Sequence, residues 1–227
     1  MAQQLIWEKE YQNPQLVTGG EEPLKDVRNF LKFLRKKGSE RNNLKILDLG
    51  SGSGKNANYL AELGNEVVGL EISKTAIKIA SENATARGVG VRYINQSIGD
   101  EYPFPDNDFD LAIDVTSSNS LNEEERNIYL AETKRVLKPG AYFFVRALCL
   151  DGDKNAKNLL KMFPGKEKDT YLIKEMGLIE RVFSEKDFRD LYSDYFEIIA
   201  LDKKSSYAKF GNQSYKRNYW LAYLRKR

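Results

Sequence analysis

The chain has 227 residues, of which 41% are hydrophobic and 30% are charged, and its formal net charge is +3. These values are typical of a soluble globular protein with one domain, and no apolar run approaches the roughly 18 residues that span a bilayer. The absence of histidine and the single cysteine, Cys149, exclude histidine metal sites, Ser/His and Cys/His nucleophile pairs and an internal disulfide, so we expect no metal site.

Residues 1–40 are predicted to form an amino-terminal lid and a helix. Trp7 and Tyr11 are four residues apart, so they share one face of a helix. This pair either folds over a bound ligand or simply packs against the domain, and the sequence leaves both open. From Glu21 onward, acids and Pro23 precede apolar residues at helical spacing, which predicts a helix that covers one face of a sheet.

The next stretch predicts a buried strand, a glycine turn and a helix. Residues 44–49 are mostly apolar, as in a parallel strand that is covered on both faces. Gly50, Gly52 and Gly54 follow, and their missing side chains allow a sharp turn and the close approach of a ligand. Residues 55–63 then show helical spacing, so the turn leads into a helix amino terminus.

The spacing of these glycines distinguishes between ligand classes. The dinucleotide pattern GxGxxG requires a third glycine where this chain has Lys55, and the phosphate loop fails at Leu49 and Asn56. The pattern that fits is DxGxGxG, from Asp48 to Gly54. A carboxylate at position 48 would repel a pyrophosphate and suits a ligand with an amino group and a positive centre.

A second strand is predicted at residues 66–70, and it ends in Glu71, 21 residues after Gly50. In a strand-helix unit of this length, an acid at that position lies beside the first glycine turn, where it can accept hydrogen bonds from a ribose diol. The alternative is an acid that caps the next helix, but Ser73 already supplies that cap for a helix at residues 74–87.

Three more strands are predicted: residues 91–94, residues 108–115 and a fifth strand that follows the turn at Pro139 and Gly140. The strand 108–115 ends next to the first strand where the strand order reverses, which is where ligands bind in open α/β sheets. The polar residues 117–120 after it are interpreted as part of this site, as a cap for the helix that follows, or as both.

The carboxyl-terminal third is predicted to contain an insertion and a closing hairpin. Residues 151–183 are interpreted as a substrate-facing insertion of short helices, held down by packing side chains. These side chains are Met162, Phe163, Tyr171 and Met176. Ser184 is predicted to cap a helix that ends at Tyr192, and residues 196–201 and 219–224 are predicted to pair as the hairpin. Cys149 has apolar neighbours and is interpreted as a buried thiol.

Four segments in order resemble the motifs of one enzyme family. DLGSGSG at residues 48–54 looks like motif I of the class I S-adenosylmethionine-dependent methyltransferases, and three segments match later motifs. These are VVGLEIS at 67–73, YPFPDNDFDLAID at 102–114 and RVLKPGAYFFV at 135–145. The resemblance covers about residues 25–148. It implies one α/β domain over residues 1–227, with a Rossmann-like, doubly wound, seven-stranded, mostly parallel sheet and an antiparallel carboxyl-terminal hairpin.

The resemblance also implies the cofactor S-adenosyl-L-methionine, with S-adenosyl-L-homocysteine as product. Family members place an acid on the adenine amine about five residues before the Pro-Phe pair, but this chain has Ile98 there and Asp100 two residues later. The role of Asp100 is therefore left open. The residues expected to contact the cofactor are Asp48, Gly50, Ser51, Gly52, Gly54, Glu71, Ile72, Ser97, Ile98, Gly99, Asp114, Val115 and Thr116.

Methyl transfer from a sulfonium is an in-line displacement that depends mainly on alignment and on exclusion of water. If the acceptor must lose a proton, Asp114, Tyr11 and Tyr171 are the candidate bases. The expected function is methylation of a small molecule by a cytoplasmic enzyme without membrane contact. The acceptor and the oligomeric state are left open.

Two alternatives also remain open at this point. One is a cofactor-binding protein without catalysis. The other is an RNA methyltransferase, because residues 201–227 hold eight Lys and Arg against one Asp, a net charge of +7. In that case Tyr207, Tyr215, Tyr219 and Trp220 would stack on bases.

Overall fold

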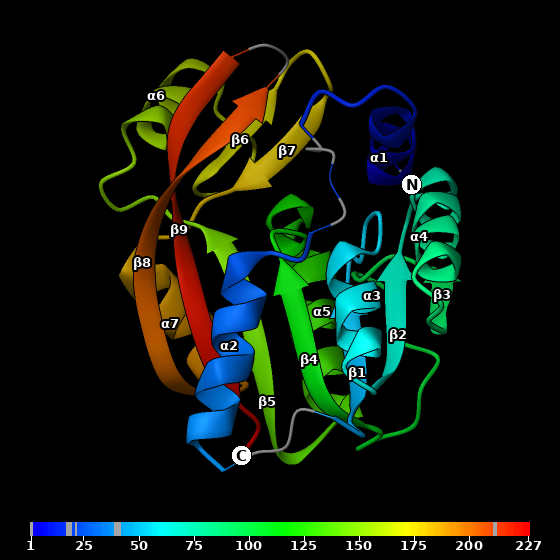
Figure 1. Ribbon diagram of the computed structural model, residues 1–227. Helices are drawn as coiled ribbons and strands as arrows, with labels where there is room; N and C mark the ends of the chain where they lie inside the picture. The colour runs from blue at the N-terminus through cyan, green and yellow to red at the C-terminus, as the bar shows by residue number, and fades with distance from the viewer. Residues whose placement is uncertain (1, 17–19, 21, 39–41, 211–212) are drawn as a thin grey trace.

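The computed structural model describes residues 2–16, 20, 22–38, 42–210 and 213–227. Across these residues, the main sheet has seven strands in the order β3-β2-β1-β4-β5-β9-β8 (Figure 1). The strands of this sheet are β1 (Lys45–Leu49), β2 (Glu66–Glu71), β3 (Val91–Asn95), β4 (Phe109–Val115), β5 (Leu137–Leu148), β8 (Glu197–Phe210) and β9 (Gln213–Arg225).

The topology confirms the predicted fold. Strands β3, β2, β1, β4 and β5 are parallel, whereas β9 is antiparallel to both β5 and β8. The strand order reverses between β1 and β4, so the carboxyl ends of these two strands open onto the crevice in which such sheets bind ligands. Ile46, Leu47 and Leu49 of β1 are fully buried, as expected for a strand with both faces covered.

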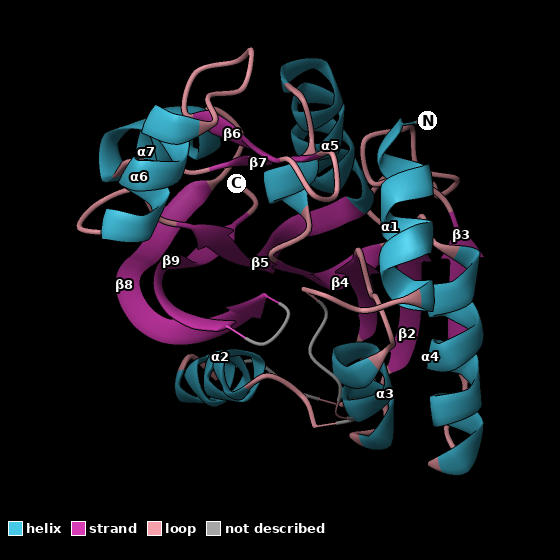
Figure 2. Ribbon diagram, turned by 90° about the horizontal axis from the view of Figure 1, so that it is seen from above, coloured by secondary structure: helices cyan, strands magenta, loops and turns pink. Residues whose placement is uncertain are grey.

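Helices cover both faces of the sheet (Figure 2). On one face, α2 and α3 pack on side chains of β1 and β4, and α4 lies beside α3. On the other face, α5 and α7 pack around Phe143 and Phe196. The helices are α1 (Ala2–Gln12), α2 (Lys25–Lys36), α3 (Lys55–Glu62), α4 (Lys74–Ala86), the short 3₁₀ helix η1 (Ser118–Ser120), α5 (Glu123–Val136), α6 (Lys154–Met162) and α7 (Glu185–Ser193).

Local capping explains where several helices begin. The Ser73 hydroxyl accepts a hydrogen bond from the Ala76 amide at the start of α4, and Ser184 caps α7 in the same way, as predicted. Helix α5 begins with a capping box between Asn122 and Glu125, so the polar run at 117–120 forms η1 and does not supply this cap.

The insertion differs from the prediction of short helices. It contains α6 followed by a hairpin of β6 (Thr170–Ile173) and β7 (Leu178–Arg181). Tyr171 is fully buried, as expected, but the side chain of Met162 is 64% exposed and does not hold the segment down. Strands β6 and β7, with the sequences TYLI and LIER, are only four residues long and do not alternate between apolar and polar residues, so their pattern does not distinguish a strand from a helical turn.

The closing hairpin is much longer than the predicted strands 196–201 and 219–224. Strands β8 and β9 remain paired from Glu197 and Arg225 out to Phe210 and Gln213, so the mostly polar residues 202–210 and 213–218 also form strand. This outer part extends beyond the sheet and curves over the carboxyl ends of the parallel strands (Figures 1 and 2). It lacks the apolar alternation that marks a half-buried strand, which is why the sequence pattern did not reveal it.

The amino-terminal segment lies at the same end of the molecule. Helix α1 packs on α4, and its Glu8 accepts hydrogen bonds from the Ser73 hydroxyl (2.8 Å) and from the amide and hydroxyl of Thr75 (3.2 and 2.5 Å). The Thr75 hydroxyl and these further donors lower the pKa of Glu8 to about 2. Helix α2 begins at Lys25, whereas Glu21 of the predicted helix start and residues 17–19 lie outside the described residues.

Within the described residues, no helix has the length and apolarity needed to span a membrane. The same part of the chain contains no group of three or more Cys, Asp or Glu side chains arranged to hold a metal ion.

Candidate active site

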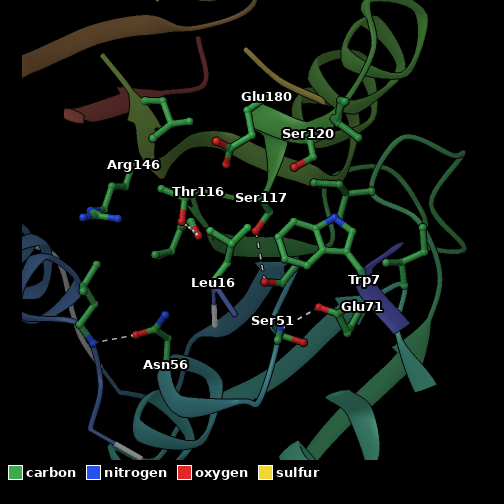
Figure 3. A pocket seen from close by; sticks show the side chains of 18 of the residues that line it. Trp7, Leu16, Ser51, Asn56, Glu71, Thr116, Ser117, Ser120, Arg146 and Glu180 are labelled. Carbon is green, nitrogen blue, oxygen red and sulfur yellow. Dashed lines mark hydrogen bonds between the residues drawn. The ribbon is translucent and has the colours of Figure 1, made fainter. Parts of the chain in front are cut away.

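A cavity of 390 Å³ opens at the carboxyl ends of β1, β2, β4 and β5. This volume lies within the range of about 300–1,000 Å³ that is usual for small-molecule sites. One half is formed by the glycine loop and the strand ends of the predicted cofactor site, with Trp7 of α1 beside Glu71, and the other half by β5, β7 and the β8–β9 hairpin (Figure 3).

The three glycines of the loop have positive φ angles of 71°, 55° and 80°, which disfavour other residues. Their surroundings differ. A Cβ atom on Gly50 would collide with Ser117, and one on Gly54 would lie 2.8 Å from the Cβ of Ala80. A Cβ on Gly52 would meet only the Tyr11 hydroxyl, at the cavity surface. Gly50 and Gly54 therefore permit close packing of the chain itself, while Gly52 faces the space for a ligand.

Glu71 lines the cavity beside this loop and is only 5% exposed. Its two carboxylate oxygens accept hydrogen bonds from the amides of Gly52 and Ser73, both at 2.8 Å, which fixes the side chain. Burial raises its pKa. Each oxygen keeps a free lone pair, so the carboxylate can still accept hydrogen bonds from a diol.

Asp48 and Asp114 lie behind the cavity and are absent from its lining. Burial, and then the charges of Asp114 and Glu71, raise the pKa of Asp48 to about 8, and its Oδ2 has no hydrogen-bond partner among the described residues. Burial also raises the pKa of Asp114, which accepts hydrogen bonds from the Ser117 amide (2.8 Å) and the Tyr129 hydroxyl (2.7 Å). Asp114 therefore holds the loop after β4 in place, a different position from that expected of a catalytic base.

Ile72, Ser97 and Ile98 line the end of the cavity at which the sequence places adenine. Gly99 does not, because it packs against α5, where a Cβ atom would lie 2.7 Å from the Cβ of Glu125. Asp100 is exposed and also lies outside the lining.

At the end of β4, Val115 and Thr116 line the cavity as expected from their position at the reversal of strand order. Thr116 has a φ angle of 64°, which is unusual for a β-branched residue. Its amide donates a hydrogen bond of 2.8 Å to the carbonyl of Arg146, so β5 helps to hold this conformation. Ser51 also lines the cavity, and its buried hydroxyl has no hydrogen-bond partner among the described residues.

The remaining walls come from segments distant in sequence. Trp7, Tyr11 and Leu16 reach the cavity from the amino terminus, so the aromatic pair does face it. The sequence patterns did not point to Lys55, Gln96, Arg146, Glu180 and Arg217 as lining residues, and the last two reach the cavity only through the insertion and the long hairpin. Ser117 and Ser120, from the run interpreted as part of the site, line the cavity too, as do Tyr207 and Tyr215 of the hairpin.

Neither tyrosine named as a candidate base is suited to that role. Burial raises the pKa of Tyr11 well above its ordinary value, and the charge of Glu71 raises it further. Tyr171 is fully buried outside the cavity lining, and burial raises its pKa too. Burial likewise raises the pKa of the Cys149 thiol to about 12, which agrees with an inert buried cysteine.

Comparison with known proteins gives a family match for the central part of the chain. Residues 47–145 match the family model described as a methyltransferase domain. The 2-heptyl-1-hydroxyquinolin-4(1H)-one methyltransferase of Mycobacteroides abscessus is 34% identical over 100 residues, which cover 44% of each chain. The fatty-acid O-methyltransferase of Mycolicibacterium smegmatis is 31% identical over 101 residues, covering 44% of this chain and 35% of the enzyme. The match thus spans less than half of either relative.

Solved structures extend the similarity beyond this segment. A SAM-dependent methyltransferase from Methanosarcina mazei is 27% identical with a TM-score of 0.73, and the alignment covers 85% of this chain and 96% of that one. The 1,6-didemethyltoxoflavin-N1-methyltransferase of Burkholderia thailandensis, solved with its substrate and S-adenosylhomocysteine, shares the fold with a TM-score of 0.68 at 16% identity, over 99% of this chain and 87% of that one.

Proposed function

We propose that this chain, a class I S-adenosylmethionine-dependent methyltransferase by sequence and by fold, transfers the methyl group of its cofactor to a small-molecule acceptor. The observation that carries the proposal is the continuity of one cavity. The same 390 Å³ space contains the glycine loop with Glu71, beneath α1, and a second half enclosed by β5, β7 and the hairpin. A cofactor in the first half would present its methyl group to an acceptor in the second.

The cavity residues fit this cofactor. The carboxylate of Glu71, fixed by two amides at the cavity, is a polar group suited to a nucleoside, and we assign the ribose diol to it. We assign the adenine ring to Ile72, Ser97 and Ile98, which offer two apolar side chains and one hydroxyl at the far end.

The remaining predicted residues have supporting roles in this proposal. Asp48 and Asp114 act from behind the loops, and Gly54 and Gly99 allow helices to approach closely. Val115 and Thr116 lie where the sulfonium end would face the acceptor. When bound, the cofactor supplies an activated methyl group, so the task of the protein is to align the acceptor and exclude water.

The structure offers no support for the RNA alternative, because several basic residues of the carboxyl terminus have partners within the molecule. Lys204 pairs with Asp26, and the Arg217 side chain is 4% exposed and bonds to the Tyr171 hydroxyl at 2.7 Å. Trp220 is 3% exposed and donates a hydrogen bond to the carbonyl of Phe183, so it is not available for stacking on bases.

The proposal is tested by supplying methyl-labelled S-adenosylmethionine with pools of small molecules and, separately, with total RNA. We expect label to enter at least one small-molecule pool and to depend on the enzyme. Label that enters RNA alone would contradict the proposed acceptor class. Cofactor binding without any transfer would favour a binding protein that lacks catalysis.

A further inference from the structure

The acceptor half of the cavity is formed largely by residues outside the matched family segment 47–145. Arg146, Glu180, Arg217 and Tyr219 all follow that segment and come from β5, β7 and β9. The charges in this half therefore belong to the part of the chain in which this protein can differ from its relatives. They indicate which chemical groups an acceptor should carry.

Arg146 brings a poorly compensated positive charge to the cavity. Its side chain is 11% exposed and its guanidinium carbon lies 3.4 Å from the centre of the Tyr219 ring. Its Nε is 3.4 Å from a carboxylate oxygen of Asp26 but makes no hydrogen bond in the described structure. The other oxygen of Asp26 bonds to Lys204, so two cations share this one buried carboxylate.

A third cation lies in the same space. Lys55 lines the cavity, and burial together with the charge of Arg146 lowers its pKa. Among the described residues no carboxylate forms an ion pair with Lys55. A buried charge is costly unless it is paired, so this side of the cavity favours a ligand with an anionic group.

Glu180 places a carboxylate on another wall (Figure 3). It accepts a hydrogen bond from the Tyr171 hydroxyl, which in turn accepts one from Nη2 of Arg217 at 2.7 Å. Nε of Arg217 lies 3.7 Å from a carboxylate oxygen of Asp153. Tyr171, Arg217 and Asp153 are each at most 4% exposed, so a buried polar chain holds Glu180 at the cavity surface.

The space near these charges is bounded by aromatic side chains. Trp7, Tyr215 and Tyr219 line the cavity, and Tyr207 stands at its rim with 75% of its surface exposed. Flat apolar surfaces of this kind pack well on a planar ring. Arg146 is already stacked on one of them, so its polar edge remains available for a carboxylate.

We infer that the acceptor is a small aromatic acid that also carries a hydroxyl or an amino group, with its carboxylate at Arg146 and its nucleophile at Glu180. This inference rests on the proposed function. A lone pair of the nucleophile forms the new bond to the methyl carbon while the carbon-sulfur bond breaks and its electrons leave with the thioether sulfur. The proton of the nucleophile passes to the Glu180 carboxylate and then to water.

The test begins with binding and uses the full chain saturated with S-adenosylhomocysteine. Calorimetry compares the isomeric hydroxybenzoates and aminobenzoates, each with its own amide. We expect at least one acid to bind at least tenfold more tightly than its amide, because charge-assisted hydrogen bonds to Arg146 need the carboxylate. Arg146→Met should remove this difference, and Arg146→Lys should keep part of it. Arg225→Met, on an exposed residue of the neighbouring strand β9, is the control and should preserve it.

The outcomes separate the two proposals. If S-adenosylhomocysteine does not bind, the proposed function itself is contradicted. If it binds but no acid is preferred over its amide, or if Arg146→Met leaves the preference intact, the acceptor class is wrong. If Arg146→Met weakens the binding of S-adenosylhomocysteine and changes nothing else, Arg146 holds the carboxylate of the cofactor, which also overturns the inference.

Glu180→Gln tests the second contact. It should leave binding of the preferred acid within about threefold and lower its methylation by roughly 100-fold or more, the usual effect of losing a proton acceptor. Unchanged methylation would exclude Glu180 as the proton acceptor. Tyr171→Phe, which removes its buried support, should lower methylation less than Glu180→Gln does.

Discussion

Three carboxylates surround the glycine loop, and their surroundings give them different tasks. Glu71 faces the cavity and is fixed by two amides, whereas Asp48 and Asp114 lie behind it. Asp114 has its oxygens occupied by the loop after β4, and Asp48 has one buried oxygen without a partner among the described residues. Of the three, Glu71 is therefore the one placed to hold a ligand directly.

Replacement of Glu71 tests this assignment. Glu71→Ala should weaken binding of S-adenosylhomocysteine by about 1.5–3 kcal/mol, the usual contribution of a hydrogen bond to a charged group. Calorimetry on the variant gives this value, with Glu82→Ala as a control on an exposed glutamate of α4. Unchanged affinity would mean that the diol lies elsewhere.

The raised pKa of Asp48 predicts a pH dependence of stability. The folded protein keeps a proton on Asp48 up to about pH 8, whereas the unfolded chain loses it near the ordinary value of 3.8. The stabilisation is therefore complete below pH 3.8 and is lost as the pH rises toward 8. Urea unfolding at pH 5 and pH 8 should show a smaller loss of stability for Asp48→Asn than for the wild type. An equal loss of stability between pH 5 and pH 8 in both proteins would contradict the raised pKa of Asp48.

At the scale of elements, the glycine loop combines two functions that substitution can separate. Gly54 allows α3 to approach α4, and Gly52 keeps the cavity surface open. The sequence pattern gave both glycines one interpretation, the approach of a ligand. Their different neighbours, Ala80 for Gly54 and Tyr11 for Gly52, became apparent only in the folded chain.

Alanine at position 54 should mainly lower the stability of the protein, whereas alanine at position 52 should mainly weaken ligand binding. Gly54→Ala should destabilise the protein by roughly 2–5 kcal/mol, because it adds overpacking against Ala80 to the strain of a left-handed backbone. Gly52→Ala should cost only about 1–2 kcal/mol of stability but reduce binding of S-adenosylhomocysteine at least tenfold. Urea unfolding and calorimetry on both variants decide this, and normal binding by Gly52→Ala would show that the loop is not the site.

The parallel core was predictable because its signals are local. The apolar run at 44–49, the glycine turn and the cap at Ser73 each lie within a few residues, and the structure has them as predicted. The outer half of the β8–β9 hairpin was not predictable, since its strands are held by pairing between residues 202–210 and 213–221. Arg146, Glu180 and Arg217 converge only through that tertiary arrangement, so no spacing in the sequence joins them.

At the scale of the molecule, two separate parts of the chain meet above the sheet. Helix α1 from the amino terminus and the β6–β7 hairpin from the insertion both lie at the carboxyl ends of the parallel strands, and Ile6 of α1 is next to Gly177 (Figure 1). Together with the β8–β9 hairpin they enclose a cavity whose inner half belongs to the matched family segment. Under the proposed function, this division assigns cofactor binding to the common core and acceptor recognition to the surrounding segments.

The most direct test of the central claim is a calorimetric titration of the purified protein with S-adenosylmethionine, S-adenosylhomocysteine and NAD. We predict micromolar binding of both sulfur compounds and no binding of NAD, because the glycine loop has Lys55 in place of the third glycine of the dinucleotide pattern. If neither sulfur compound binds, or if NAD binds in their place, the proposed methyl transfer is contradicted and the fold alone remains.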